Sequence, residues 1–313
     1  PSMVRWNYTP ERLSSGVKSL HGDLALLNDG SVVGARASAF WSNPSLGLDG
    51  TIPVTKILHN DHHALALRID GSVVKISSNQ AEVSIVEGME SGVDDIFANR
   101  YTFAALKGDE LLAISGHSYS GMPSEEQLPL LQNGVVNVFP TWHGFTVLKD
   151  DGSLLQLGDN SYGGLSHSDW QAAFSHADDL IGNVVDVIGI EDKRIFIVND
   201  DQTGVYIQPG HPSKTRLVDD IAKIVPATGR SPYLAVIKND GSIDLPAGGL
   251  EHWPGLAKEE GNPFVNIFAA DHGYFYLKAD NTLIFSTNHS TTNSVQLPAE
   301  RSITSVTSSR SRV

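Results

Sequence analysis

The sequence ALALRIDGSVV at residues 64–74 shows the pattern that decides the fold: two short apolar runs joined by Asp70-Gly71. Asp-Gly between two such runs is a strong signal for a β-hairpin, because this dipeptide tolerates the positive φ of a tight primed turn. Another apolar segment, Val54-Thr-Lys-Ile57, precedes the hairpin. This part of the chain therefore predicts a first strand, a loop, a second strand, an Asp-Gly turn and a third strand.

The same unit recurs along the chain at a nearly constant period. From Asp29, the steps to the corresponding aspartates are 41, 39, 42, 50, 39 and 40 residues. Degenerate turns stand at Gly108-Asp109, Asp201-Gln202 and Asp280-Asn281. A period of about 40 residues, with four short strands in each unit, is the signature of a β-propeller. We therefore predict an all-β, seven-bladed propeller that forms a single domain over residues 3–313.

The first strand of the unit also repeats, and the chain ends resemble parts of the unit. The first-strand segments are Val17–Leu20, Val54–Ile57, Val93–Ile96, Val135–Val138, Val184–Val187, Ile221–Ile224 and Val265–Ile267. Another such segment begins at Ile303, while Val4–Asn7 resembles a third strand. We expect the N- and C-terminal strands to close the ring, which removes an exposed sheet edge. The alternative is an eighth, reduced blade formed by the two ends.

The long step of 50 residues indicates an inserted helix. Ser168-Asp-Trp-Gln171 has the form of a capping box. Trp170, Ala173, Phe174 and Ala177 then recur at the spacing of one helix face.

Composition excludes several classes of protein. The 313 residues contain 22 Lys and Arg against 36 Asp and Glu, a net charge of −14. This balance disfavours nucleic acid and anionic membranes as partners, because proteins bind both through Lys and Arg side chains. No cysteine is present, which excludes disulfides and thiolate chemistry. Apolar runs are too short to cross a membrane, so we expect a soluble protein. Pro1-Ser2 is interpreted as a tag remnant, and no signal peptide is visible. The sequence does not indicate the cellular compartment.

The residues resemble the regulator of chromosome condensation repeat family. Val54-Thr-Lys-Ile57, His63-Ala-Leu-Ala-Leu67 and Asp70-Gly-Ser-Val73 follow its repeat, and the copy from Val136 to Gly163 fits over its whole length. Among relatives the chain looks most like bacterial propellers of the β-lactamase inhibitory protein II type. The resemblance implies the propeller fold and the use of one face for binding. The family includes exchange factors, inhibitors and ubiquitin-ligase modules, so the fold does not select a function.

Strand parity predicts which loops share a face. Connections that follow first strands lie opposite the Asp-Gly turns, together with the connections that follow third strands. Aromatic and Arg residues recur there, as they do in interface hot spots. The candidate ligand-binding residues are Trp41, His62, Tyr101, Tyr119, Trp142, His143, Tyr162, Arg194, Arg230, Tyr233, Trp253, His272 and Tyr274.

Chemical motifs for catalysis or cofactor binding are weak in this sequence. His59-Asn-Asp61-His-His63 is the best metal candidate, but His63 stands at a structural position of the family repeat, so we expect no metal or cofactor. Gly116-His-Ser118-Tyr-Ser120 lacks the last glycine of a nucleophile elbow. We therefore expect a non-enzymatic module that binds a folded protein, such as an enzyme it inhibits or a regulator. A propeller lectin that binds glycans and a nucleotide exchange factor for a small GTPase are the alternatives.

Overall fold

A computed structural model divides the chain into two compact units, Pro1–Gly163 and Gly164–Val313, and each unit is described by itself. The prediction of one domain over residues 3–313 stays a prediction. The structure describes residues 16–22, 24–34, 48–60, 63–77, 83–115, 122–141, 144–158, 167–190, 194–226, 234–246, 256, 260–270, 273–287 and 290–298. The segments at 4–7 and 303–306, which were expected to close the ring or form an eighth blade, lie outside these residues.

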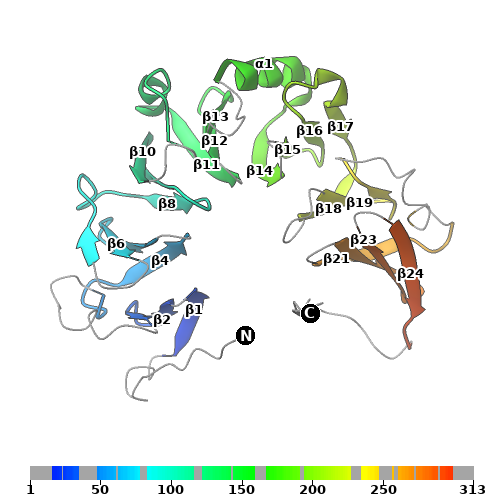
Figure 1. The fold of residues 1–313 in the computed structure, drawn as a ribbon, viewed down its shortest axis with the longest axis horizontal. Helices are drawn as coiled ribbons and strands as arrows, with labels where there is room; N and C mark the ends of the chain where they lie inside the picture. The colour runs from blue at the N-terminus through cyan, green and yellow to red at the C-terminus, as the bar shows by residue number, and fades with distance from the viewer. Residues whose placement is uncertain are drawn as a thin grey trace. The chain divides into compact units, whose positions relative to one another are not determined.

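The described residues form seven separate antiparallel sheets of three or four strands, the blades of a β-propeller, as the repeat predicted (Figure 1). We number the blades in chain order and call the strands of each blade first to fourth. The first unit contains blade 1 (β1 Val17–His21, β2 Leu24–Leu27, β3 Val32–Gly34), blade 2 (β4 Val54–His59, β5 His63–Arg68, β6 Val73–Ser77, β7 Val83–Ile85), blade 3 (β8 Asp95–Ala98, β9 Phe103–Lys107, β10 Glu110–Ser115) and blade 4 (β11 Val135–Thr141, β12 Gly144–Lys149, β13 Leu154–Gly158).

The second unit continues the same strand order. It contains blade 5 (β14 Val184–Ile190, β15 Arg194–Asn199, β16 Gly204–Ile207, β17 Arg216–Val218), blade 6 (β18 Ile221–Pro226, β19 Leu234–Lys238, β20 Ile243–Asp244) and blade 7 (β21 Phe264–Ala270, β22 Gly273–Lys278, β23 Thr282–Thr287, β24 Ser290–Gln296). Short 3-10 helices occur at η4 Leu128–Leu131, η5 Asp178–Leu180 and η6 Pro212–Lys214.

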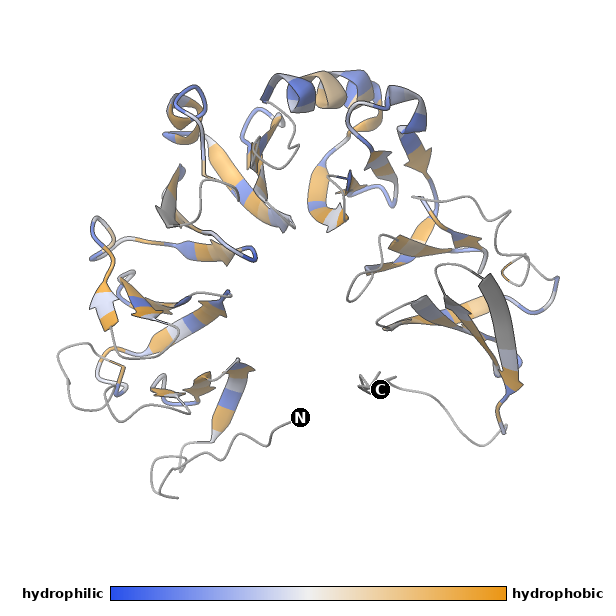
Figure 2. Cartoon of the chain, in the orientation of Figure 1, coloured by the Kyte–Doolittle hydropathy of each residue, from blue (hydrophilic) through white to orange (hydrophobic). Residues whose placement is uncertain are grey.

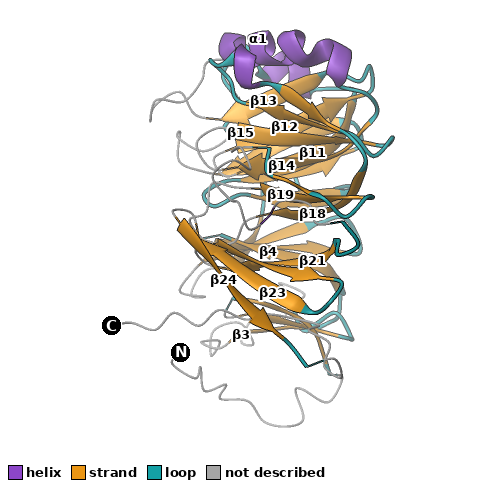
Figure 3. Ribbon diagram, turned by 90° about the vertical axis from the view of Figure 1, so that its right-hand side faces the viewer, coloured by secondary structure: helices purple, strands orange, loops and turns teal. Residues whose placement is uncertain are grey.

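The predicted helix is present as α1, His167–Ala177, the one α-helix among the described residues (Figure 3). It begins one residue before the expected cap at Ser168. Trp170, Phe174 and Ala177 are buried, and the two aromatic rings lie 5.6 Å apart. The helical spacing of these residues in the sequence therefore marked the buried face correctly.

Each blade has a turn end and a loop end. The turn end carries the hairpin between the second and third strands, and the loop end carries the connection between the first and second strands. In blade 2, Leu67 pairs with Val73 beside the turn, while His59 pairs with Ala64 beside the loop. Antiparallel pairing puts these two connections at opposite ends of every sheet, as predicted from strand parity.

The hairpin turns are present, but their geometry differs from the predicted primed turn. In blade 2, the Gly71 N–H donates to Arg68 O and the Arg68 N–H donates to Ser72 O. Gly71 has a φ of +76°, whereas Asp70 is not among the described residues with positive φ. This is a three-residue loop in which only the glycine is left-handed. The Asp70 backbone keeps a negative φ. Its carboxylate accepts hydrogen bonds from the Ser72 N–H and hydroxyl.

A backbone hydrogen bond joins each hairpin turn to the blade that follows it within a unit. A residue at the start of the next first strand, or in blade 3 two residues before it, donates its N–H to a carbonyl of the turn. These bonds are Val54 to Gly30 (2.9 Å), Val93 to Gly71 (2.9 Å), Val135 to Asp109 (2.9 Å), Ile221 to Gln202 (2.9 Å) and Phe264 to Gly241 (3.0 Å). The turn thus sets where the next blade begins.

The cores lie between successive blades. Leu24, Leu26 and Val32 of blade 1 pack with Val54 and Ile57 of blade 2, and equivalent clusters join blades 2 and 3, 3 and 4, 5 and 6, and 6 and 7. Figure 2 shows apolar residues along the strands and polar residues at many of the turns. Each sheet therefore buries its face against its neighbour in the unit, as packed sheets do.

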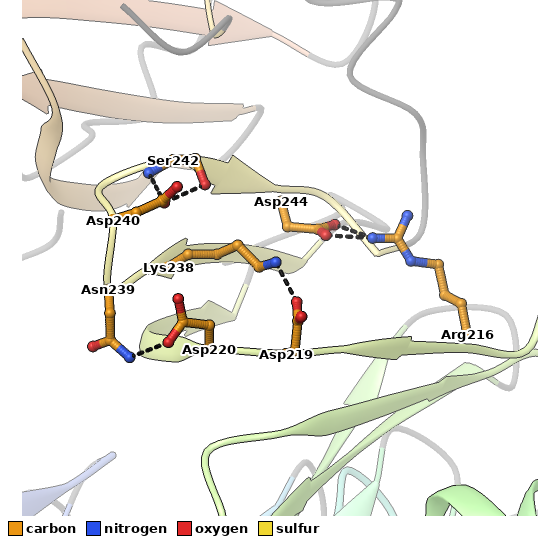
Figure 4. A network of polar contacts seen from close by, with 8 residues as sticks. All are labelled: Arg216, Asp219, Asp220, Lys238, Asn239, Asp240, Ser242 and Asp244. Carbon is orange, nitrogen blue, oxygen red and sulfur yellow. Dashed lines mark hydrogen bonds and ion pairs between the residues drawn. The ribbon is translucent and has the colours of Figure 1, made fainter. Parts of the chain in front are cut away.

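Charged side chains reinforce the turn end of blade 6 (Figure 4). Lys238 pairs with Asp219, and the hydrogen bond between them raises the pKa of Lys238 and lowers that of Asp219. Arg216, on the last strand of blade 5, contacts both carboxylate oxygens of Asp244 in blade 6. The Arg216–Asp244 pair joins two blades, and each of these partly exposed pairs contributes little stability.

We expect Gly71→Ala to destabilise the protein more than Gly108→Ala. Both glycines are left-handed, which costs an alanine about 1–2 kcal/mol. A Cβ at Gly71 would also lie 2.5 Å from the Gly92 nitrogen, whereas nothing described lies within 4 Å of one at Gly108. Urea unfolding measures both variants. Equal losses for the two would show that the turn does not pack against the next blade.

Acid should weaken the fold through the turn aspartates. Hydrogen bonds from the following Ser or Thr lower the pKa of Asp70, Asp151, Asp201 and Asp280. A lowered folded-state pKa gives stability that is present above the unfolded value of about 4 and is lost as the pH falls through the folded value. We expect this contribution to be constant from pH 5 to 7 and to decline below pH 4. Carboxyl NMR titrations would contradict this if these groups titrate at or above the unfolded value.

Candidate binding site at the loop end of blades 3 and 4

The first-to-second connection of blade 3 is described in full, and its backbone is held by one side chain. Asn99 Oδ1 accepts hydrogen bonds from the N–H groups of Tyr101 (2.9 Å) and Thr102 (2.8 Å). The Asn99 N–H donates to Thr102 O at 3.0 Å. Asn99 and Thr102 are both buried. These hydrogen bonds fold the four-residue turn, residues 99–102, around the side-chain amide of Asn99.

The same side chain ties this turn to the next blade. Asn99 Nδ2 donates to Gly144 O, at the start of β12, over 3.2 Å. Gly144 is required here because a Cβ would lie 1.9 Å from Leu157 O. The turn of blade 3 is therefore fixed against the loop end of blade 4.

The turn presents an arginine stacked on an aromatic ring. The Arg100 guanidinium lies 5.1 Å from the centroid of the Tyr101 ring. Arg100 is exposed and Tyr101 is half-buried. A cation over an aromatic face is an attractive arrangement, and it restricts a long side chain before any ligand arrives. Arg and Tyr are also residue types that are enriched in interface hot spots.

A buried amide network holds the neighbouring end of β11. Gln156 Nε2 donates to Thr141 Oγ1 at 3.2 Å, and Thr146 Oγ1 donates to Gln156 Oε1 at 2.5 Å. Gln127 Nε2 donates to Gln156 O at 2.9 Å. Thr146, Gln156 and Gln127 are buried. Satisfied buried polar networks of this kind rigidify the backbone they contact.

Arg194, a second predicted residue, lies at the loop end of blade 5. It is half-buried as the first residue of β15, and its side chain hydrogen-bonds to Tyr206. Burial raises the pKa of the Tyr206 hydroxyl, and the nearby Arg194 charge opposes this rise. The guanidinium is thus held partly by its own blade.

Tyr274 differs from its prediction as a loop residue. It is the second residue of β22, is 3% exposed and packs in the core between blades 6 and 7. Its ring lies 5.9 Å from that of Tyr276, and burial raises the pKa of its hydroxyl. The second strand of blade 7 begins at Gly273, earlier than the sequence suggested, which places Tyr274 on the inner face of the sheet.

The other candidates cannot be placed. Ten predicted residues lie outside the described residues: Trp41, His62, Tyr119, Trp142, His143, Tyr162, Arg230, Tyr233, Trp253 and His272. Among the residues that are described, no three potential ligands gather into a metal cluster. No helix in the described part of the chain is long and apolar enough to cross a membrane.

Sequence analysis did not identify the role of Asn99. A repeated asparagine could have indicated this role, because Asn60 stands at the same point of blade 2. There the Asn60 N–H donates to His63 O at 2.9 Å, and Asn60 Oδ1 accepts from the His63 N–H at 3.0 Å. Asparagine thus closes the loop-end turn in two successive blades.

Comparison with solved structures finds similar chains at 12% identity. No family model and no curated protein matches the sequence. Prp20p from Saccharomyces cerevisiae has 12% identity and a TM-score of 0.41, with 84% of this chain and 68% of that chain covered. YCF48 from Cyanidioschyzon merolae has 12% identity and a TM-score of 0.38, with 84% and 90% covered. The CRINKLY WD40 ectodomain from the Arabidopsis thaliana receptor kinase ACR4 has 12% identity and a TM-score of 0.33, with 88% and 77% covered.

We expect Asn99→Ala to unfold more easily by about 2 kcal/mol, because it leaves buried backbone groups without their hydrogen bonds. The amide hydrogens of Tyr101 and Thr102 should also exchange faster. Denaturant unfolding and hydrogen exchange measure both effects. Asn137→Ala is the matched control, since exposed Asn137 accepts a bond from the neighbouring Val138 N–H. Equal losses in the two variants would contradict a special role for Asn99.

Proposed function

We propose that this chain is a non-enzymatic docking module that holds a folded protein partner at the loop end of its blades. The observation that supports this is the Arg100–Tyr101 pair, which stands on a turn closed by Asn99 and fixed to blade 4. A pair whose conformation is set beforehand loses less entropy on binding than a free side chain. This favours recognition of a surface over recognition of a flexible small molecule.

The chemistry of the pair indicates what the partner must offer. The guanidinium takes carboxylates and planar acceptors, and the tyrosine ring takes apolar or π contact. The turn ends carry the aspartates of the hairpins, whereas the described loop-end turn of blade 3 carries a cation and an aromatic ring. The loop end is thus the end whose residue types match protein hot spots. An inhibited enzyme, as the resemblance to β-lactamase inhibitory protein II suggests, is one such partner.

The test is quantitative capture followed by an affinity measurement with the recovered partner. Arg100→Ala and Tyr101→Ala should each weaken binding by about 2 kcal/mol, roughly thirtyfold, without unfolding the blades. Trp142→Ala and Tyr233→Ala, at predicted loop-end positions, should behave in the same way. The matched control is Ile69→Ala, an exposed apolar truncation at the turn end, which should leave affinity unchanged.

Other outcomes would replace the proposal. Loss of affinity with Ile69→Ala alone would move the interface to the turn end. Hits on a glycan array that disappear with the loop-end variants, together with no captured protein, would establish the lectin alternative. A captured small GTPase whose nucleotide release is accelerated would establish the exchange-factor alternative.

A further inference from the structure

Two histidines of successive blades stand at the loop end of the first unit. His21 ends the first strand of blade 1, and His59 ends the first strand of blade 2. Gly22, directly after His21, lies against the His59 ring: a Cβ there would be 2.6 Å from His59 Cδ2 and 3.0 Å from Nε2. Gly22 also has a φ of +60°, a backbone conformation that favours glycine.

Each of the two imidazoles has a contact of its own. The edge of His59 that carries Nε2 faces the Gly22 backbone. His21 Nε2 lies 2.7 Å from Ser19 Oγ, a hydrogen bond that fixes its ring and leaves Nδ1 as the nitrogen for another ligand. After burial, the charge of His59 is the second influence that lowers the pKa of His21, which agrees with their proximity.

We propose that His21 and His59 bind one divalent transition-metal ion, of which Zn²⁺ is the representative. Neutral imidazole is the nitrogen ligand that such ions prefer, through either ring nitrogen. His21 would bind through Nδ1 and His59 through Nε2. A histidine that ligates a metal usually engages its other nitrogen with an oxygen, the position that Ser19 Oγ holds here.

The remaining coordination positions would be filled by solvent. Among the described residues no three potential ligands cluster, and in this proposal the two imidazoles supply two of the ion's coordination positions. The ion would also link blades 1 and 2 at the end opposite the turn of blade 1, whose Gly30 carbonyl already bonds to Val54. Metal binding should therefore stabilise the folded chain.

Calorimetric titration of the full chain with zinc sulfate tests the site. We expect one Zn²⁺ per chain and a higher melting temperature with zinc. His21→Gln and His59→Gln should each weaken binding at least tenfold, and the double variant should abolish it. Ser19→Ala should weaken binding about tenfold, the effect typical of losing an outer-shell partner. The nitrogen resonances of His21 and His59 should shift together with zinc.

The matched control removes two exposed histidines elsewhere, His176→Gln with His211→Gln, and should bind zinc as the original chain does. His59 is exposed, so its variant is expected to fold even where His21→Gln does not; circular dichroism checks this. Zinc binding that survives in His59→Gln, or that is lost equally in the control, would overturn the proposal. So would an original chain that binds zinc no more tightly than the double variant.

Discussion

The hydrogen bond between a hairpin turn and the first strand of the following blade is the constraint on which the rest of each unit depends. It connects the Gly30 carbonyl to the Val54 N–H and recurs at four further junctions. Because the donor lies at or just before the start of a strand and the acceptor lies in a turn, the bond fixes where one sheet starts relative to the preceding one. The apolar faces can then meet in register, as Leu26 and Ile57 do in the core between blades 1 and 2.

This constraint explains why the two ends of a blade have different sequences. The turn end must keep a left-handed residue, an aspartate that caps the turn and a carbonyl aimed at the neighbour. The loop end carries none of these requirements, so its connections are able to vary. Asn99 and Asn60 show how local rigidity returns there through side-chain amides rather than through glycine. A rigid scaffold that supports variable connections is a common basis for binding surfaces.

The sequence was sufficient for the architecture because the repeat is a periodic signal. Asp70-Gly71 and its six counterparts located the turn between the second and third strands in each described blade. The spacing of Trp170 and Phe174 located α1. The predicted primed turn was wrong because Asp-Gly requires only one left-handed residue, the glycine, whereas a primed turn of this kind requires two. Tyr274 was misplaced because a strand boundary one or two residues away decides whether a side chain faces the core. The Asn99–Gly144 and Gly22–His59 contacts join residues 45 and 37 positions apart, and no local pattern encodes such pairs.

Cores that lie between sheets have a consequence for how such a chain gains or loses length. A single blade has two faces to cover and no interior of its own, so removing one would uncover the apolar face of its neighbour. Stability in such arrays depends mainly on nearest neighbours. Duplication or deletion can therefore add or remove whole units of about 40 residues without leaving an apolar face exposed to solvent. The inserted helix α1 shows the other permitted change, growth within a connection, where Trp170 and Phe174 bring their own apolar contact.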